Sequence, residues 1–142
     1  MSDLGAIRTA ILATASGVAG ISRAYPRLPE AIAGTPAIVL GQMTWTSVPG
    51  QVADIDTYTF DLWLYVERLA TDDQTISTAD DFIGLILAAF SQGITLGNAG
   101  STRSALIRGG RANEWVKIGG SEYMRVGFHL EVSARPARNR TA

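Results

Sequence analysis

Two long stretches of this sequence alternate between apolar and polar residues, and no other feature constrains the fold as strongly. The first covers residues 58–67 and the second residues 124–135. Alternation with a period of two is typical of a β-strand that buries one face. The apolar positions are Tyr58, Phe60, Leu62, Leu64 and Val66 in the first stretch, and Met124, Val126, Phe128, Leu130, Val132 and Ala134 in the second. We therefore predict two long strands with one face packed against helices.

Two other segments carry apolar residues at the spacing of an amphipathic helix. Ser2 is the predicted N-cap of the first helix, which ends at Gly17 and Gly20. Ser77 or Thr78 is the predicted N-cap of the second helix. The predicted buried positions are Leu4, Ile7, Ile11, Leu12 and Val18 in the first helix, and Ala79, Phe82, Ile83, Ile86, Leu87 and Phe90 in the second.

The remaining segments are short strands, loops and turns. Residues 44–57 are polar and contain glycine, which favours a loop or the tip of a long hairpin. The acidic pairs Asp54/Asp56 and Asp72/Asp73 are predicted to lie on solvated loops. Further strands are predicted at residues 37–40, 102–108 and 113–118, with Gly109-Gly110 between the last two and a tight hairpin turn at residues 119–121.

The predicted order is one helix, two or three strands, a second helix, and two or three further strands. The simplest fold with this order is α/β (α+β), with a single mixed β-sheet of about five strands and two helices packed against it. A chain of 142 residues fits one domain, which we assign to residues 1–135. Residues 136–142 follow the last strand and are predicted to form a basic C-terminal tail.

Nothing in the sequence predicts export or membrane insertion. The first residues lack a basic start. The longest apolar run, residues 82–90, is far shorter than the roughly 20 residues of a membrane helix. We expect a soluble protein made in a cytoplasm, with no membrane partner.

Residues suited to catalysis or metal binding are few. The chain has no cysteine, so thiolate nucleophiles and thiolate metal sites are excluded. His129 is the single histidine, and no acidic or serine motif stands at a useful spacing from it. Serine-hydrolase, phosphate-loop and calcium-loop motifs are absent from the sequence. We therefore predict no catalytic residue, no metal site, no cofactor and no enzyme activity.

Charge is unevenly distributed along the chain. Residues 1–102 carry four basic and ten acidic residues, a net charge of −6, whereas residues 103–142 carry eight basic and three acidic residues, a net charge of +5. This asymmetry favours head-to-tail contact between identical subunits, unless the charges intermix on folding. Arg135, Arg138 and Arg140 near the C-terminus are candidates for docking onto a neighbouring protein or for contact with DNA phosphates.

Three tryptophans are candidate interface residues. Trp45, Trp63 and Trp115 lie on, or next to, strand faces that are otherwise polar. Tryptophan is enriched at protein interfaces. Partial burial under a helix or a loop is an equally good interpretation of this pattern.

The order of these segments and their amino-acid sequences resemble those of a known family. An N-terminal helix of the type Met-Ser-Asp-Leu-Gly-Ala-Ile-Arg leads through a prolyl segment to the strand Pro-Ala-Ile-Val-Leu. The strand that begins at Tyr58 precedes the second helix, and the chain closes with Gly-Ser-Glu-Tyr-Met-Arg-Val-Gly-Phe-His-Leu-Glu-Val from Gly120. From about residue 3 to residue 135, this resembles the tail terminator (tail completion) proteins of long-tailed bacteriophages.

The resemblance implies a structural virion protein. Such proteins form a homo-hexameric ring that caps the head-proximal end of the tail tube, stops tube polymerisation and joins the tail to the head connector. The implied partners are further copies of the chain, the major tail (tube) protein and a head-completion or connector protein, with non-specific contact to DNA in the ring lumen. The implied location is the neck of the virion, after assembly in the host cytoplasm.

Two other interpretations remain open. Another subunit of the phage neck, a head-closure protein or connector adaptor, has a similar size. A small dimeric α/β ligand-binding domain belongs to a different class, and it requires an apolar pocket with converging polar groups.

Overall fold

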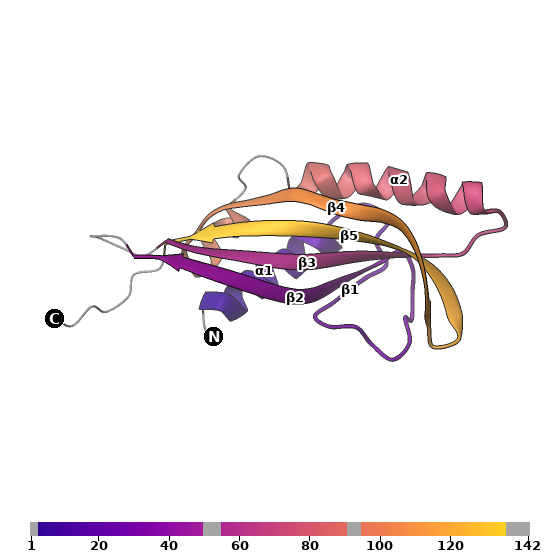
Figure 1. Cartoon of the computed structure of the whole chain (residues 1–142), viewed down its shortest axis with the longest axis horizontal. Helices are drawn as coiled ribbons and strands as arrows, with labels where there is room; N and C mark the ends of the chain where they lie inside the picture. The colour runs from indigo at the N-terminus through magenta and orange to yellow at the C-terminus, as the bar shows by residue number, and fades with distance from the viewer. Residues whose placement is uncertain (1–2, 50–54, 91–94, 136–142) are drawn as a thin grey trace.

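The computed structural model describes residues 3–49, 55–90 and 95–135. A single sheet has the strand order β1-β2-β3-β5-β4, in which β1 runs parallel to β2 and all other neighbours are antiparallel (Figure 1). The predicted fold, a mixed sheet of about five strands with two helices packed against it, is confirmed. The elements are α1 (Asp3–Ser16), β1 (Arg23–Tyr25), β2 (Ala37–Val48), β3 (Ile55–Glu67), α2 (Asp72–Ala89), a short turn segment η1 (Leu96–Ser101), β4 (Thr102–Ile118) and β5 (Ser121–Ala134).

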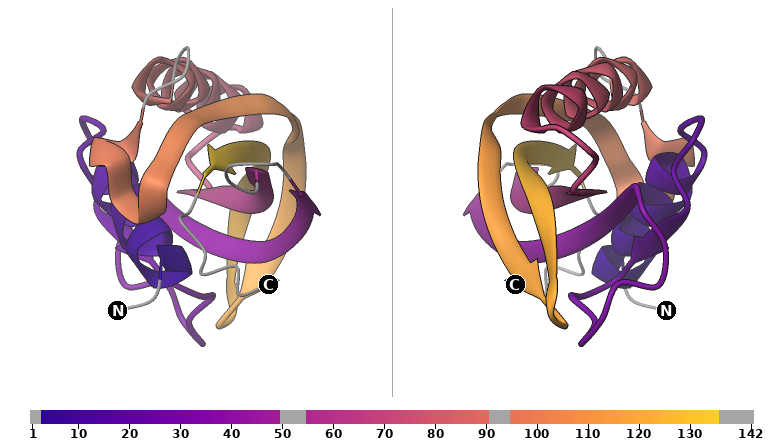
Figure 2. Two further views of the ribbon diagram at one scale, coloured as in Figure 1. Left: turned by 90° about the vertical axis from the view of Figure 1, so that its left-hand side faces the viewer. Right: turned by 90° about the vertical axis from the view of Figure 1, so that its right-hand side faces the viewer.

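Both helices pack on the same face of the sheet, and the core lies between them and the central strands. Seen from either end, the sheet is strongly curved, with α1 along one side and α2 next to β4 (Figure 2). All the predicted apolar positions of β5, and those of β3 from Phe60 onward, belong to this core. Each fully buried aliphatic or aromatic side chain contributes about 1.5–3 kcal/mol to folding. α1 adds Ile7 and Ile11, and α2 adds Ala79 and Ile86.

The opposite side of the sheet, called here the outer face, carries a smaller apolar cluster. Val39, Tyr65 and Tyr123 are buried there. The rings of Tyr65 and Tyr123 meet edge to face, with centroids 6.3 Å apart. The segment between β1 and β2 folds over this cluster, where the backbone N–H of Ala33 donates to the Tyr25 hydroxyl. In the described part of the chain, no helix covers the rest of the outer face.

Of the two alternatives for residues 44–57, the loop is wrong and the long hairpin is confirmed. β2 continues to Val48 and β3 begins at Ile55, so these residues pair with each other as a long hairpin whose residues 50–54 lie outside the described part. Asp56 is buried and accepts hydrogen bonds from Ser47 and Tyr58, so the predicted solvated position is wrong for this residue. The two hydrogen bonds from these hydroxyls compensate for the cost of burying the Asp56 carboxylate in the strand. Asp54 lies outside the described residues.

The N-cap of the second helix lies six or seven residues before the predicted N-cap, Ser77 or Thr78. The side chain of Thr71 is the N-cap and accepts from the backbone N–H of Gln74. Asp72 and Asp73 therefore lie in the first helical turn rather than in a loop, where the helix dipole favours negative charge. Leu87, predicted to be buried, is 44% exposed.

The two strands predicted at residues 102–108 and 113–118 form one strand of 17 residues, β4. Gly109 and Gly110 lie inside it, because three irregularities in its register with β5 let it bend without breaking. The predicted hairpin turn is confirmed: Gly119 and Gly120 both have positive φ, as a type I′ turn requires. Among the described helices, none is long and apolar enough to cross a membrane.

Candidate interaction surfaces

The ring of Trp63 lies over a glycine of each neighbouring strand on the outer face. Gly127 pairs directly with Trp63 across β3 and β5, and Gly41 lies on β2. A Cβ atom added at Gly127 would lie 2.6 Å from the Trp63 ring, and one added at Gly41 would lie 2.7 Å from its Nε1. Both distances are too short for any side chain. The two glycines therefore form a slot across three strands, in which the indole is held.

Arg125 stacks on the exposed side of this indole. Its Cζ atom lies 4.3 Å from the ring centroid, and its Nη2 donates to Glu114 Oε1 at 2.6 Å. Partial burial disfavours the charge of Arg125, but hydrogen bonds to Glu114 and Tyr65 outweigh it, and the pKa of Arg125 is raised. Within the described residues, its Nε is buried without a hydrogen-bond partner. The arginine is a fixed positive charge above an aromatic ring.

His129 faces Asp61 across the same two strands. The two residues are register partners, and Nδ1 of His129 lies 3.2 Å from Oδ1 of Asp61. The histidine side chain is 60% exposed. It is a hydrogen-bonded surface residue. The sequence did not identify Asp61 as its partner, because the register of β3 on β5 determines which distant residues lie side by side.

These residues do not form a catalytic site of the usual kind. A carboxylate–imidazole pair acts in nucleophilic catalysis when a third, nucleophilic group is hydrogen-bonded to the imidazole. In the described part of the chain, the side-chain hydrogen-bond partner of His129 is Asp61 alone. No cluster of three or more histidine, aspartate or glutamate residues that could ligate a metal ion occurs in residues 3–49, 55–90 and 95–135. The outer face has hollows on both sides of Trp63, of about 260 and 650 Å³.

Trp115 and Trp45 differ in their surroundings. Trp115 is covered by Arg68, whose Cζ lies 4.7 Å from the ring centroid. Arg68 also pairs with Glu122 and with Asp72. The hydrogen bond to Glu122, and after it the negative charge of Asp72, raise the pKa of Arg68. This cluster joins the β4–β5 hairpin to the start of α2. Trp45, by contrast, is 64% exposed.

Of the six predicted interface residues the structure describes four, and the three tryptophans among them lie apart. Trp63 is on the outer face, Trp115 at the β4–β5 hairpin, and Trp45 near the end of β2. Arg135 is exposed directly after β5. Arg138 and Arg140 lie outside the described residues. Their role at an interface stays a prediction.

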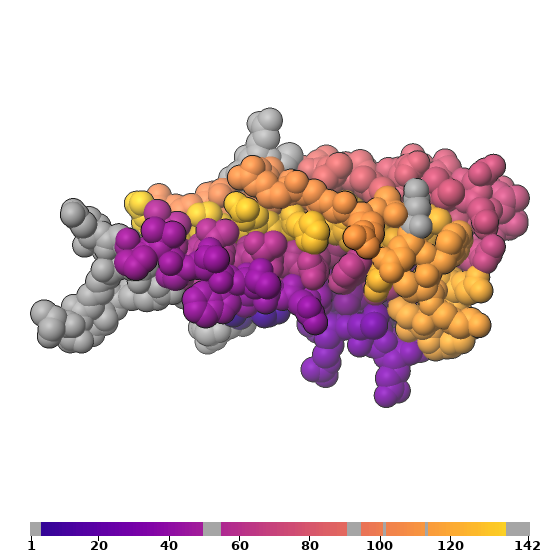
Figure 3. All heavy atoms as spheres, viewed as in Figure 1, coloured from indigo at the N-terminus to yellow at the C-terminus, as the bar shows by residue number. Residues whose placement is uncertain are grey.

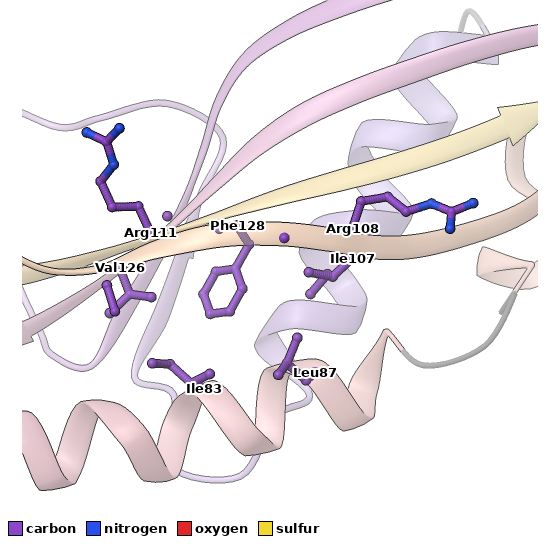
Figure 4. Close-up of a pocket in the computed structure, with 11 residues that line it drawn as sticks. Ile83, Leu87, Ile107, Arg108, Arg111, Val126 and Phe128 are labelled. Carbon is purple, nitrogen blue, oxygen red and sulfur yellow. The ribbon is translucent and has the colours of Figure 1, made fainter.

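An apolar groove between α2 and β4 was not predicted (Figure 4). Its volume is about 350 Å³. Ile83 and Leu87 of α2 face Val126 and Phe128 of β5 across it, and Ile107 of β4 lies beside them. The sequence pattern missed this groove because it assigned Leu87 to the core. The pattern also predicted two separate strands on either side of Gly109 and Gly110, which line the groove.

We expect the Trp63 slot to show strong coupling between its residues. Gly127→Ala should lower the free energy of unfolding by about 1–3 kcal/mol, because the new methyl group displaces the indole. In a Trp63→Ala background the same substitution should cost less than about 0.5 kcal/mol, since nothing then occupies the slot. Urea unfolding of the four proteins of this cycle measures the difference. An equal cost in both backgrounds would show that Trp63 does not lie in the slot.

No protein-family model and no curated protein matches this sequence. Solved structures do match it. One is a chain of a structure described as the virion of a native gene transfer agent (GTA) particle, with a TM-score of 0.64 and 12% sequence identity. The likeness covers 93% of this chain and 96% of that chain. It shows that the two chains share one fold over almost their whole length.

Proposed function

We propose that this protein is a non-enzymatic structural subunit of a phage-like particle, and that within the particle it is the tail terminator. In this role it forms a hexameric ring on the head-proximal end of the tail tube, stops tube polymerisation and joins the tail to the head connector.

The observation that carries the proposal is the shared fold with a chain of a GTA virion. The alignment covers both chains almost completely, so the whole domain, rather than one common motif, is shared. The resemblance of the sequence to tail terminators points to the same kind of particle by an independent route. Fold alone does not determine function, so the proposal also depends on the surfaces of the molecule.

Those surfaces suit an assembly subunit. The described residues form a rigid curved sheet with exposed apolar and cation–aromatic features in different places: Trp45 at one end, the Trp63–Arg125 stack on the outer face and the α2–β4 groove at the edge. A ring subunit needs two unlike lateral surfaces and two unlike axial surfaces. The alternative of a ligand-binding domain predicts a closed pocket, whereas the hollows found here are surface grooves.

The partners follow from the same proposal. They are copies of this chain, the tube protein on one axial side and a head-completion or connector protein on the other. The basic segment 136–142, with Arg138 and Arg140, would form an axial or DNA contact, because its charges favour phosphates or acidic protein surfaces. The particle neck is then the location of the protein.

Disruption of the reading frame in the genome that encodes this chain tests the proposal. We expect particles whose tail tubes exceed the normal length and remain separate from filled heads, as seen by electron microscopy. The matched control restores the full chain from a plasmid and should restore the tail length and the joining of tails to heads.

Other results distinguish the alternatives. Tails of normal length beside heads that leak DNA would contradict the terminator role and favour a head-closure or connector-adaptor subunit. Normal, infectious particles would contradict any structural role in the virion.

A further inference from the structure

The sheet has two open edges in the described part of the chain. β4 is the last strand on one side, and it pairs with β5 alone. On the other side, β1 pairs with residues 37–39 of β2 and leaves residues 43–48 without a neighbouring strand. β4 and β2 run along opposite long sides of the molecule (Figures 1 and 3). An edge strand directs the backbone N–H and C=O groups of every second residue away from its own sheet.

The outward backbone groups of two segments are regularly spaced and have no backbone partner. Apart from the ladders with β3 and β5, no backbone hydrogen bond within the described residues involves residues 43–48 or 104–107. The register with the neighbouring strand is irregular before Met43, before Ser104 and after Ile107, but not inside either segment. Each segment therefore presents the even row of donors and acceptors that an added strand requires.

Neither segment carries the features that protect edge strands from pairing. Proteins block such edges with charged residues, proline or bulges. Residues 43–48 and 104–107 contain no charged residue and no proline. Pro49 follows the first segment directly, and Arg103 and Arg108 stand on either side of the second. The protection thus borders the two segments and leaves both of them open.

The two open segments lie at the same level along the strands. The register connects β2 to β4 through β3 and β5 without a shift at this level. One row across the sheet consists of Thr46, Thr57, Ser133 and Ser104, and the row three residues along consists of Met43, Phe60, Leu130 and Ile107. Copies of the chain placed side by side would therefore bring residues 43–46 next to residues 104–107.

The side chain of Trp45 fits this arrangement. Trp45 pairs directly with Tyr58, so its side chain lies on the same face of the sheet as Tyr58, which packs against the core. It is nevertheless 64% exposed. The same row ends on β4 at Ala105, whose small side chain leaves room for a neighbouring indole. An added strand would cover the apolar surface of Trp45, which favours association.

From these observations we infer that residues 43–48 of one copy of this chain pair with residues 104–107 of the next copy, so that the sheet continues from copy to copy. Three successive antiparallel pairings make β4 run opposite to β2. Rotation about an axis along the strands keeps their directions, so the new pair is antiparallel as well. The contact joins two unlike edges, and its repetition closes a ring. The inference rests on the proposed function and adds to it the strand edges by which neighbouring subunits join.

The expected register follows from the two faces of the sheet. Met43 should face Ile107 of the next copy, since both side chains pack against the core. Thr46 should then face Ser104. A slip by one residue would turn the apolar side chains of one strand to the opposite face.

Oxidation of paired cysteines tests this register directly, because the chain has no cysteine of its own. Facing residues of neighbouring strands have Cβ atoms about 4.5–5.5 Å apart, so a disulfide can join them with a small adjustment. In the full chain carrying both Thr46→Cys and Ser104→Cys, β3 and β5 separate the two thiols within one copy. We expect a ladder of multimers on a non-reducing gel. A mixture of the two single variants should stop at the dimer, since each chain then offers one reactive edge.

The controls separate this contact from others. Lys117 is exposed near the far end of the same edge strand, so Thr46→Cys combined with Lys117→Cys should give no ladder. An equally strong ladder from this pair would overturn the inference. Dimers from Thr46→Cys alone or from Ser104→Cys alone would also overturn it, in favour of a symmetric contact between two like edges.

Hydrogen exchange of the unmodified chain gives a second test, with dilute protein compared with assembled protein. The outward amides of residues 43–48 and 104–107 should exchange at least about tenfold more slowly in the assembly, because each then donates to a carbonyl of the neighbouring copy. Residues 114–118 of β4 should exchange at the same rate in both. Closed rings with unchanged exchange in the two segments would refute this contact while leaving the proposed ring function intact. Failure of the chain to form any ring at millimolar concentration would count against both.

Discussion

Phe60→Ala is expected to lower the free energy of unfolding by about 3–5 kcal/mol, as for other buried phenylalanines. Phe60 is fully buried at the middle of β3, the central strand of the sheet. Its ring lies 6.5 Å from that of Tyr58, and the Cζ of Arg8 on α1 lies 5.4 Å from its centroid. Removal of the ring leaves a cavity between the sheet and α1 that neither element can close by moving.

Urea unfolding followed by circular dichroism measures this loss. Leu28→Ala is the matched control, since Leu28 is half-exposed, and it should cost less than about 0.5 kcal/mol. A domain of this size has a total stability of roughly 5–15 kcal/mol. The Phe60→Ala protein should therefore be partly unfolded at moderate temperature. A cost under about 1 kcal/mol would show that β3 is not at the centre of the core.

Gly110→Ala is expected to cost about 3 kcal/mol, at the upper end of the usual range for overpacking. A Cβ atom at Gly110 would lie 3.1 Å from the carbonyl carbon of Gly127 and closer still to its oxygen. The obstacle is backbone rather than a mobile side chain, so β4 and β5 must separate locally. Hydrogen exchange should then show faster exchange in β4 and β5 around this pair.

Gly109→Ala is a matched control one residue away. A Cβ atom at Gly109 meets nothing within 4 Å, so this substitution should change the stability by less than about 0.5 kcal/mol. Equal effects of the two substitutions would contradict the register of β4 on β5.

Much of the fold could be predicted from local patterns. The alternation in β3 and β5 showed which residues form the core, because a strand with one buried face has only one arrangement of its apolar residues. The turn was predicted from Gly119 and Gly120, because glycine readily adopts the positive φ that both turn positions require. The helices were predicted from their spacing, although the second begins at Asp72 rather than near Ser77, since Thr71 caps it.

The parts that could not be predicted depend on pairing between distant segments. Residues 44–48 lead into Pro49 and Gly50, which favour a loop, but they are extended because β3 pairs with them. Gly109 and Gly110 usually mark a break in a strand, but β5 runs alongside them and keeps β4 continuous. The same holds for the surfaces. Asp61 meets His129, and Trp63 meets Gly127, only through the register of β3 on β5.

The three tryptophans have similar positions in the sequence pattern but different surroundings in the structure. Trp63 and Trp115 are each covered by an arginine of the same chain, which explains their partly polar surroundings. Trp45 is far more exposed than either. Tryptophan is enriched among the residues that contribute most to binding at interfaces, so the exposed Trp45 is the tryptophan that most favours a subunit contact.

The proposed function requires that identical copies of this chain assemble into a closed ring. Electron microscopy of the purified full chain, at concentrations up to the millimolar range, tests it most directly. We predict ring-shaped particles with sixfold symmetry and a central opening, and a mass by light scattering of six chains. Particles of one or two chains at every concentration, with no ring in any class average, would contradict the claim.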